Sequence, residues 1–403
     1  MLAAGVWSLV VLFAFAIVPP RWRLPARRSV LWLFLLALGV RLLPNVILKV
    51  GGGYDIESFA LVGEMLAHGR EIYAATEGVN RHPYLPLYLY WLAAAWNLAQ
   101  LTGLVFVQVV RLLPIAADVG VSLALFVGLR GRDAHLAWQA GLLYALNPVA
   151  VFVAAYHGQF DALPGLFLLL AVLWMERERA AGSGFWLGLG ILAKSYPVLA
   201  LPMLFWQARG ARAKAMLLTG AVLVPLGGVA LYAFGFSAAP LLILRRALTY
   251  NWGVGIWGYT YLLRMAAQIF EQPDLYRWVF AWGRVLTLAV LAGVFLWRAR
   301  HEPPARGILL ILLTFFAAGH AFSIQYLGWL LPLALWNGEF RWARRYTLAA
   351  FAYMFLVYFS LILQSTITNL LPWPQADWYL LMPLGLPIWL VCVFWGIKCL
   401  RQN

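Results

Sequence analysis

Long apolar runs recur along the whole chain, and they restrict the fold more than any other feature of the sequence. An α-helix needs about 20 apolar residues to cross a hydrocarbon core about 30 Å thick. Of the 403 residues, 64% are hydrophobic and only 11% are charged, a composition that excludes an ordinary soluble globule. A transmembrane barrel would show short alternating segments separated by turns. The sequence therefore predicts an all-α, polytopic integral membrane protein.

The apolar runs predict about 11 to 13 transmembrane or half-spanning helices. We expect them at residues 3–19, 29–48, 104–128, 136–156, 161–176, 184–194, 197–207, 215–235, 278–297, 306–322, 325–337, 347–364 and 378–398. Two pairs, 184–194 with 197–207 and 306–322 with 325–337, are too short for full crossings and predict helices broken around a cavity.

The predicted organisation is one membrane domain over residues 1–403. We expect residues 29–235 to form an N-terminal module that includes the outer loop 50–103. We expect residues 236–403 to form a C-terminal module and residues 1–28 to add a further N-terminal span.

The net charge of +15 comes from basic residues scattered over the short loops, with no stripe or arm of the kind that binds nucleic acid. One alternation of loops collects most of them, and by the positive-inside rule these loops face the cytoplasm. We therefore expect the N-terminus outside, the C-terminus inside and no nucleic-acid partner. The loops concerned contain Arg21 to Arg28, Arg130/Arg132, Arg177/Arg179, Arg209/Arg212/Lys214, Arg298/Arg300/Arg306, Arg341/Arg344/Arg345 and Lys398/Arg401.

The outer stretch 50–103 predicts two interfacial helices. Apolar residues recur there with helical period at Ile56, Phe59, Ala60, Gly63, Leu66 and Ala67. A second apolar helix is expected at 86–101, and Gly51-Gly52-Gly53 is expected to be a hinge that precedes the first.

Asp55 and Glu57 follow the span 29–48 directly. An ionised carboxylate near a membrane boundary is costly to desolvate, by roughly 3 kcal/mol or more towards the bilayer centre, so acids kept there usually have a function. Burial among apolar neighbours would also raise the pKa of Asp55, which suits a general base. The alternative is an acid in a solvated loop.

Further polar clusters fall on the same predicted outer side. They are Arg81-His82-Pro83-Tyr84, His157-Gly158-Gln159-Phe160-Asp161, Lys194-Ser195-Tyr196-Pro197, and His320 with Gln325-Tyr326. Their convergence on one side predicts a shared site.

With these motifs, the chain resembles the GT-C glycosyltransferases, integral membrane enzymes that take sugars from polyprenyl-phosphate carriers. The acid-x-acid pair at Asp55 and Glu57 resembles the first-loop signature of that class, which implies that Asp55 is the catalytic base. The segments 69–73, 81–87, 194–197 and 325–332 are similar, in family order, to motifs of GPI mannosyltransferase I and of bacterial polyprenol-phosphate-mannose-dependent mannosyltransferases. The extra first span and Glu57, where the eukaryotic enzymes usually have Asp, depart from the pattern.

An inverting transfer needs a base for the acceptor hydroxyl and cationic groups for the departing phosphate. We predict a catalytic set of Asp55, Glu57 and His320. The predicted donor-phosphate ligands are Lys194, Arg245, Arg246, Arg264 and His157. The predicted sugar or acceptor ligands are Arg81, His82, Tyr84, Gln159, Asp161, Tyr196, Gln325 and Tyr326.

Several structural alternatives stand beside these roles. Asp161 is expected chiefly to cap a helix N-terminus, and His320 can equally be a structural hydrogen-bonding residue. Arg111 and Asp118, seven residues apart, predict an intramembrane ion pair. A divalent cation, Mg²⁺ or Mn²⁺, stays open, because one acid pair can act without a metal.

The sequence and the resemblance together predict an inverting mannosyl or hexosyl transferase in the plasma membrane, with its site facing the extracytoplasmic side. Its expected partners are a polyprenyl-phosphate sugar, a lipid or glycan acceptor and membrane lipids. The alternative function is a transporter or lipid flippase for a glycolipid or polyprenyl carrier, since transporters also use broken helices and buried charges.

Overall fold

The computed structural model describes residues 2–18, 29–49, 53–78, 81–250, 253–367 and 382–401. Helices dominate these ranges, in which β-structure is limited to an isolated bridge between Val254 and Ala321. The predicted all-α class is therefore confirmed. The predicted basic loop from Arg21 to Arg28 and the predicted hinge residues Gly51 and Gly52 lie outside the described residues.

Among the described helices, five segments are long and apolar enough to cross a membrane. A sixth candidate is bent by 42° between α7 (Ala134–Ala145) and the pair formed by α8 (Pro148–Val151) and the π-helical turn η1 (Phe152–His157). The predicted polytopic membrane protein is thus confirmed. The five segments are α2 (Ser29–Ile47), α5 (Phe106–Val110) with α6 (Leu112–Leu129), α12 (Gly210–Phe236), the part of α15 (Pro273–Trp297) and η3 (Ala299–His301) from Tyr276 onwards, and η5 (Met382–Gly385) with α20 (Leu386–Arg401).

The chain divides into two compact units. Unit 1 contains Met1–Tyr250 and Leu331–Gly338, and unit 2 contains Asn251–Leu330 and Glu339–Asn403. Short apolar helices add to both units: α1 (Leu2–Ile17), α9 (Ala162–Glu176) and α10 (Ala180–Ala193) in unit 1, and α16 (Pro304–Ala318) in unit 2.

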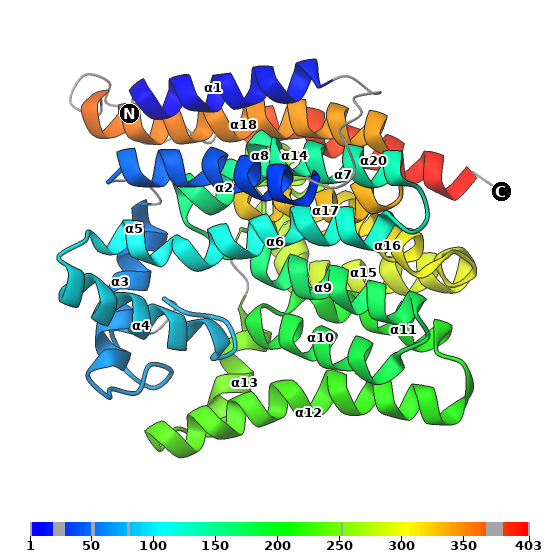
Figure 1. The fold of residues 1–403 in the computed structure, drawn as a ribbon, viewed down its shortest axis with the longest axis horizontal. Helices are drawn as coiled ribbons and strands as arrows, with labels where there is room; N and C mark the ends of the chain where they lie inside the picture. Colours follow the sequence, from blue (N-terminus) through cyan, green and yellow to red (C-terminus); the bar gives the residue numbers. More distant parts are fainter. Residues whose placement is uncertain are drawn as a thin grey trace. The chain divides into compact units, whose positions relative to one another are not determined.

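Helices α9, α10 and α12 of unit 1 lie side by side (Figure 1). Small residues allow α10 and α12 to approach closely, because a Cβ atom at Gly184 would lie 2.3 Å from the carbonyl oxygen of Leu217. A Cβ atom at Gly220 would lie 2.5 Å from the carbonyl carbon of Gly184. Such small-residue contacts are typical of helix pairs in membranes, where backbone proximity replaces a hydrophobic driving force.

The stretch 50–103 contains the two predicted helices, α3 (Gly53–Ala67) and α4 (Leu87–Thr102). Phe59, Gly63 and Leu66 of the predicted apolar face of α3 are buried. Ile56, Ala60 and Ala67 are only half-buried, whereas Ser58, Val62 and Met65 are buried, so the core-facing side is rotated from the predicted one. Helix α4 lies against this side and therefore decides which residues it buries.

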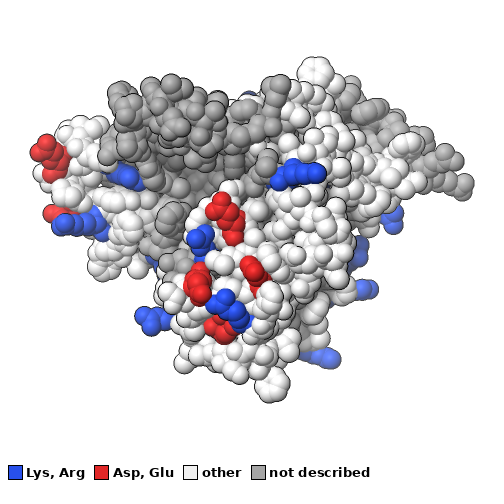
Figure 2. Space-filling model, turned by 90° about the vertical axis from the view of Figure 1, so that its left-hand side faces the viewer, with Lys and Arg blue, Asp and Glu red and all other residues white. Residues whose placement is uncertain are grey.

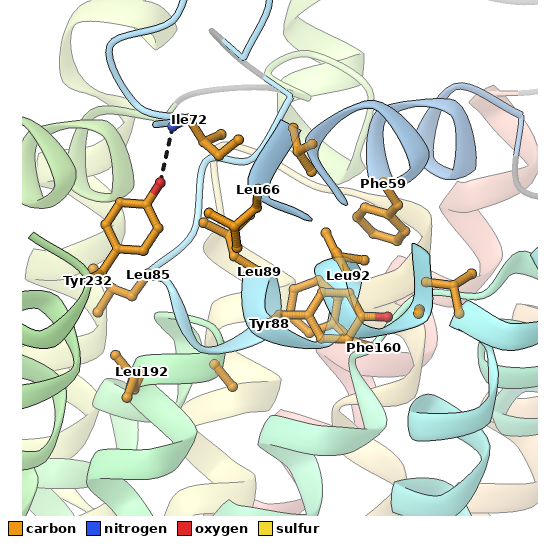
Figure 3. Packing of buried hydrophobic residues seen from close by; sticks show 14 of the residues in the cluster. Phe59, Leu66, Ile72, Leu85, Tyr88, Leu89, Leu92, Phe160, Leu192 and Tyr232 are labelled. Atoms are coloured by element: carbon orange, nitrogen blue, oxygen red, sulfur yellow. Dashed lines mark hydrogen bonds between the residues drawn. The ribbon is translucent and has the colours of Figure 1, made fainter. Parts of the chain in front are cut away.

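An apolar cluster holds α3 and α4 on the rest of unit 1 (Figure 3). The Tyr88 ring stacks on Phe160 with centroids 3.9 Å apart, and Phe59 meets Tyr88 edge-on at 5.5 Å. The Tyr232 hydroxyl of α12 accepts a hydrogen bond of 3.1 Å from the backbone N–H of Ile72, drawn as a dashed line in Figure 3. Helices α3 and α4 are therefore fixed to the rest of unit 1, which gives the residues on them defined positions.

The predicted break between residues 194 and 197 is confirmed. Helix α10 ends at Ala193, and a 3₁₀ turn, η2 (Tyr196–Ala200), leads into the short helix α11 (Leu201–Gln207). The second predicted break separates α16 from the 3₁₀ turn η4 (Ile324–Gly328) and α17 (Leu330–Trp336). Lys194 and His320 lie at these two breaks.

Unit 2 contains α14 (Gly258–Ile269), α15, α16, α18 (Phe340–Ile367) and α20. Trp257 stacks on Phe322 at 3.9 Å, and its indole N–H donates to the carbonyl of Phe316 at 2.8 Å. The Trp389 indole N–H donates to Ala317 at 2.9 Å. Aromatic contacts of this kind fix the segment that carries His320 within unit 2.

The predicted ion pair between Arg111 and Asp118 is wrong. Asp118 accepts a 2.5 Å bond from Arg41 Nε and a 2.6 Å bond from the Tyr144 hydroxyl, whereas Arg111 binds backbone carbonyls. Seven helical residues span about 10.5 Å, and Arg111 stands in the turn between α5 and α6. Arg111 and Asp118 are therefore too far apart for direct contact. The sequence pattern gave no sign that Arg41 is the partner of Asp118.

Figure 2 shows the charged side chains on one face of the molecule. Among the described residues of that face, Lys and Arg side chains are separated by uncharged surface and several stand beside acids. A continuous basic stripe is not formed there.

Candidate functional site

The site in unit 1 is built around Asp55, which lies in the first turn of α3. A carboxylate is favourable there because a helix N-terminus carries partial positive charge. Asp55 Oδ2 lies 2.8 Å from His157 Nε2, and the Asp55 side chain is 34% exposed whereas that of His157 is 4% exposed. The carboxylate is thus held from the protein side and open on the other.

His157 is delivered by the π-helical turn η1, which ends at Gly158. Gly158 has φ = +82°, a left-handed conformation that favours glycine. The backbone N–H groups of Gly158 and Gln159 both donate to the carbonyl of Val153 at 3.0 Å. This wide turn places the His157 and Gln159 side chains on the same carboxylate.

The electrostatics of Asp55 correct the sequence-based expectation of a raised pKa. Burial does raise the pKa of Asp55, but hydrogen bonds from His157 and Gln159 and the charges of His157 and Lys194 act in the opposite direction. They prevail, so the pKa of Asp55 lies below the usual value of 3.8. Asp55 is therefore ionised at neutral pH.

Lys194 forms a buried ion pair beside this group. Its Nζ donates to both carboxylate oxygens of Asp161 at 2.8 Å, and both side chains are almost fully buried. The ammonium also lies 5.0 Å from the centre of the Tyr84 ring and 5.2 Å from that of Phe160. Aromatic faces attract a cation at such distances, so Lys194 is held from several directions.

Asp161 occupies the predicted N-cap position of α9, but its side chain makes no capping hydrogen bond. The capping interpretation is wrong because the carboxylate turns to Lys194 instead. A buried ammonium without an ionic partner would be strongly destabilising, and this requirement prevails over the weaker capping interaction.

His82, Tyr84 and Tyr196 stand close to the same pair. The rings of His82 and Tyr84 meet edge-on at 5.3 Å, and Tyr84 meets Phe160 at 5.2 Å. Burial lowers the pKa of His82 to about 4, with the Lys194 charge acting in the same direction, so its imidazole is neutral at pH 7. Tyr196 is buried, and its hydroxyl lies 3.4 Å from the position of a Cβ at Gly165.

Among the described residues, the buried side-chain acceptors of this region without a hydrogen-bond partner include His82 Nδ1 and Gln159 Oε1. The other imidazole nitrogen of His82 lies 3.4 Å from the Leu85 carbonyl and so carries the proton, which leaves Nδ1 as an acceptor. Buried polar atoms of this kind are uncommon in folded proteins and are suited to ligand hydroxyls.

Arg81 follows α3 in the chain and contacts the N-terminal part of that helix. Its Nη1 donates to Ser58 Oγ at 3.0 Å, and its guanidinium lies 4.4 Å from the centre of the Tyr54 ring. Tyr250 is also near: burial, and then the charges of Asp55 and Tyr54, raise its pKa to about 12. Tyr54 and Tyr250 were not predicted; the position of Tyr54 next to Asp55 was the available signal.

Three other predicted site residues of unit 1, Glu57, Arg245 and Arg246, are exposed or half-buried. Glu57 is exposed, two residues along α3 and thus about 200° around the helix axis from Asp55. On α13 (Pro240–Thr249), Arg245 is exposed and Arg246 is half-buried.

The remaining predicted residues belong to unit 2. His320 lies 3.3 Å from the Thr287 hydroxyl, and burial, together with the charge of Arg284, lowers its pKa. Gln325 is buried and accepts a hydrogen bond from Ser323, while Tyr326 stacks on Trp329 at 3.9 Å. Arg264 lies 5.6 Å from the centre of the Tyr276 ring.

A metal-binding cluster of three or more His, Cys, Asp or Glu side chains does not occur in the described part of the chain. In unit 1 the site therefore offers a hydrogen-bonded carboxylate and a buried ion pair.

Residues 82–324 match the model of glycosyltransferase family 87. The match covers more than half of the 403 residues, so the chain belongs to this family, which is GT-C-like. The protein is accordingly a membrane-embedded glycosyltransferase. The matched range includes His82, His157, Lys194 and His320 but begins after Asp55. No curated protein matches the sequence.

Proposed function

We propose that this protein transfers a sugar, a mannosyl residue, from a polyprenyl-phosphate donor to a hydroxyl of a lipid or glycan acceptor, with Asp55 as general base. The observation that carries the proposal is the geometry of Asp55. An ionised carboxylate is anchored by His157 and Gln159 on one side and remains one-third exposed on the other. A general base needs this combination of fixed position and open access.

In the proposed reaction, Asp55 accepts the proton of the acceptor hydroxyl as its oxygen bonds to the anomeric carbon of the sugar. The bond between that carbon and the phosphate oxygen breaks, and the electron pair leaves with the polyprenyl phosphate. Attack opposite the leaving phosphate inverts the anomeric configuration. The low pKa of Asp55 ensures that the base is unprotonated before the acceptor binds.

His157 and Gln159 orient this base. An ionised carboxylate only accepts hydrogen bonds, so the proton between the two side chains resides on His157 Nε2. The His157 side chain is too buried to meet the donor phosphate directly, and we assign it this orienting role in place of the predicted phosphate contact.

The donor phosphate requires cations, and Lys194 already has a partner in Asp161. Lys194 would then attract the donor phosphate electrostatically from a distance rather than bind it directly. Arg245 and Arg246 on α13 are the proposed phosphate ligands of unit 1. The site roles of Arg264 and His320, which belong to unit 2, stay predictions from the sequence.

Sugar hydroxyls have matching partners in the unpaired acceptors His82 Nδ1 and Gln159 Oε1. The face of Tyr84, beside Lys194, adds an apolar surface for a sugar ring. We assign Arg81, Asp161 and Tyr196 to the surroundings of this subsite. The sugar-binding roles of Gln325 and Tyr326, which belong to unit 2, stay predictions from the sequence.

The proposed orientation places the site on the extracytoplasmic side of the plasma membrane. Within unit 1, α3 and α4 lie at one end of α6 and α12 (Figure 1). The basic residues that follow α6 and α9, or begin α12, lie at the other end. Because basic loops are retained in the cytoplasm, the end carrying Asp55 faces outwards.

The test is transfer of radiolabelled mannose from polyprenyl-phosphate mannose to extracted membrane lipid by the purified protein in lipid vesicles. Removal of a general base lowers turnover by about 10²- to 10⁴-fold, which we expect for Asp55→Asn. Glu64→Gln, an exposed acid on the same helix, is the matched control and should retain wild-type turnover. Equal turnover in wild type and Asp55→Asn would refute the assigned base. Without product from the wild type, the mannosyl donor is wrong and other polyprenyl-phosphate sugars replace it.

A further inference from the structure

Arg111 is a fully buried arginine in the turn between α5 and α6. Its guanidinium donates in two directions: Nη1 to the carbonyl of Leu48 at 2.9 Å, and Nη2 to the carbonyl of Tyr156. These carbonyls belong to segments far apart in the sequence. One follows the last residue of α2, and the other lies in the π-helical turn η1.

The contact with Leu48 is one of several hydrogen bonds that hold the C-terminal end of α2. Gln108, one turn before Arg111, donates through Nε2 to the carbonyls of Asn45 at 3.1 Å and Val46 at 2.9 Å. Asn45 Nδ2 returns a bond of 3.0 Å to the Gln108 carbonyl. The last carbonyls of a helix have no partners within the helix, so these donors fix the backbone from which the chain continues to Asp55.

The contact with Tyr156 lies next to the other half of the site. His157 is the following residue, and a Cβ at Gly158 would lie 3.1 Å from Arg111 Cγ. Arg111 thus touches the turn on both sides of His157. A positive charge at the C-terminal end of a helical segment is also electrostatically favourable.

We infer that Arg111 is a positioning residue that sets the distance between Asp55 and His157 by holding the backbone segments that deliver them. The inference rests on the proposed function, in which this pair is the base and its orienting group. The planar guanidinium has five donors in a fixed fork and can bind two carbonyls at once in fixed geometry, whereas a lysine ammonium is a point donor on a flexible stem. Misplacement of a catalytic group by about 1 Å can reduce turnover by 10²-fold.

The first measurement compares Arg111→Lys with Arg41→Lys. Both arginines are fully buried and both bind backbone carbonyls, but Arg41 contacts Ala37, Tyr144 and Ala145, away from Asp55 and His157. We expect Arg111→Lys to lower kcat about 10- to 100-fold with little change in the KM for the donor. Folded Arg41→Lys should retain kcat, and gel filtration with thermal unfolding in detergent establishes that each variant is folded.

The second measurement needs no substrate. In protein labelled with ¹⁵N-histidine, the hydrogen-bonded Nε2–H of His157 gives a proton signal that is identified by its loss in His157→Gln. We expect this signal to shift or broaden in Arg111→Lys and to remain in Arg41→Lys. An unchanged signal in Arg111→Lys, or the same change in both variants, overturns the inference. If the wild type transfers no mannose but the signals behave as expected, the proposed function fails and the positioning role stands.

Discussion

Unit 1 contains two groups of buried charge that differ in how completely they are paired. Within α2, α6 and α7, Arg41 donates to Asp118 and to three backbone carbonyls, and Tyr144 donates to the same carboxylate. Arg41 and Asp118 are 0% and 1% exposed. Around Asp55, by contrast, the carboxylate is 34% exposed and the neighbouring Gln159 Oε1 has no hydrogen-bond partner among the described residues.

This difference separates a structural group from a functional one. A buried carboxylate whose bonds are all made inside the protein has no access for a substrate, and breaking one bond leaves an uncompensated charge. A carboxylate anchored on one side and hydrated on the other can exchange water for a ligand hydroxyl. Charge in a membrane protein therefore indicates function only together with the state of its pairing.

The largest expected effect compares Asp118→Ala with Asp55→Ala in free energy of unfolding. Loss of Asp118 leaves Arg41 buried without its counter-ion, which costs about 3–5 kcal/mol. Loss of Asp55 should cost less than about 1 kcal/mol, because the site is already partly hydrated. Denaturant unfolding in detergent measures both. Equal destabilisation would contradict the distinction between the two groups.

An intermediate effect is expected in the pH dependence of His157→Gln. His157 contributes a hydrogen bond and a charge that lower the pKa of Asp55, so its replacement should raise that pKa. A lowered native pKa gives stability that is present above the unfolded value of about 3.8 and is lost as pH falls through the native value. Because a raised pKa protonates Asp55 at a higher pH, the acid limb of the activity profile should also move to higher pH in the variant. Turnover should fall about 10-fold, because the variant no longer orients Asp55. An acid limb at the wild-type position would show that His157 does not control Asp55.

The smallest effect compares two glycines of left-handed conformation, Gly158 with φ = +82° and Gly103 with φ = +69°. Alanine costs about 1–2 kcal/mol in this conformation at either position. At Gly158 its Cβ would also lie 2.9 Å from Ile56 and 3.1 Å from Arg111, whereas nothing lies within 4 Å at Gly103. We expect similar backbone strain in both variants, but displacement of the turn and reduced transfer only in Gly158→Ala. Equal activities would show that the turn after His157 tolerates displacement.

The fold was largely predictable because its determinants are periodic. Apolar runs gave α2, α9 and α12, and the amphipathic outer stretch gave α3 and α4 to within a few residues. The break at Lys194 followed from segment length alone. Tertiary contacts were beyond this reasoning, so the buried side of α3 was rotated by its packing on α4.

Several residues of the candidate site could be identified from the sequence, but which of them bind each other could not. Asp55, His157 and Lys194 were all identified from sequence, yet the sequence did not indicate that His157 binds Asp55 or that Lys194 binds Asp161. The wrong pairing of Arg111 with Asp118 has the same origin. Spacing along one helix says nothing about a third helix such as α2, which supplies Arg41.

The segment Leu331–Gly338 has a consequence for biosynthesis. It belongs to unit 1 although the rest of that unit ends at Tyr250. Its Trp336 donates to Glu176 at 3.2 Å and packs so closely on Gly128 that a Cβ there would lie 2.5 Å from the ring. The ribosome must therefore synthesise all the intervening residues before unit 1 receives its last piece, and a chain stopped at residue 250 would leave Gly128 of α6 and Glu176 of α9 without their contacts to Trp336.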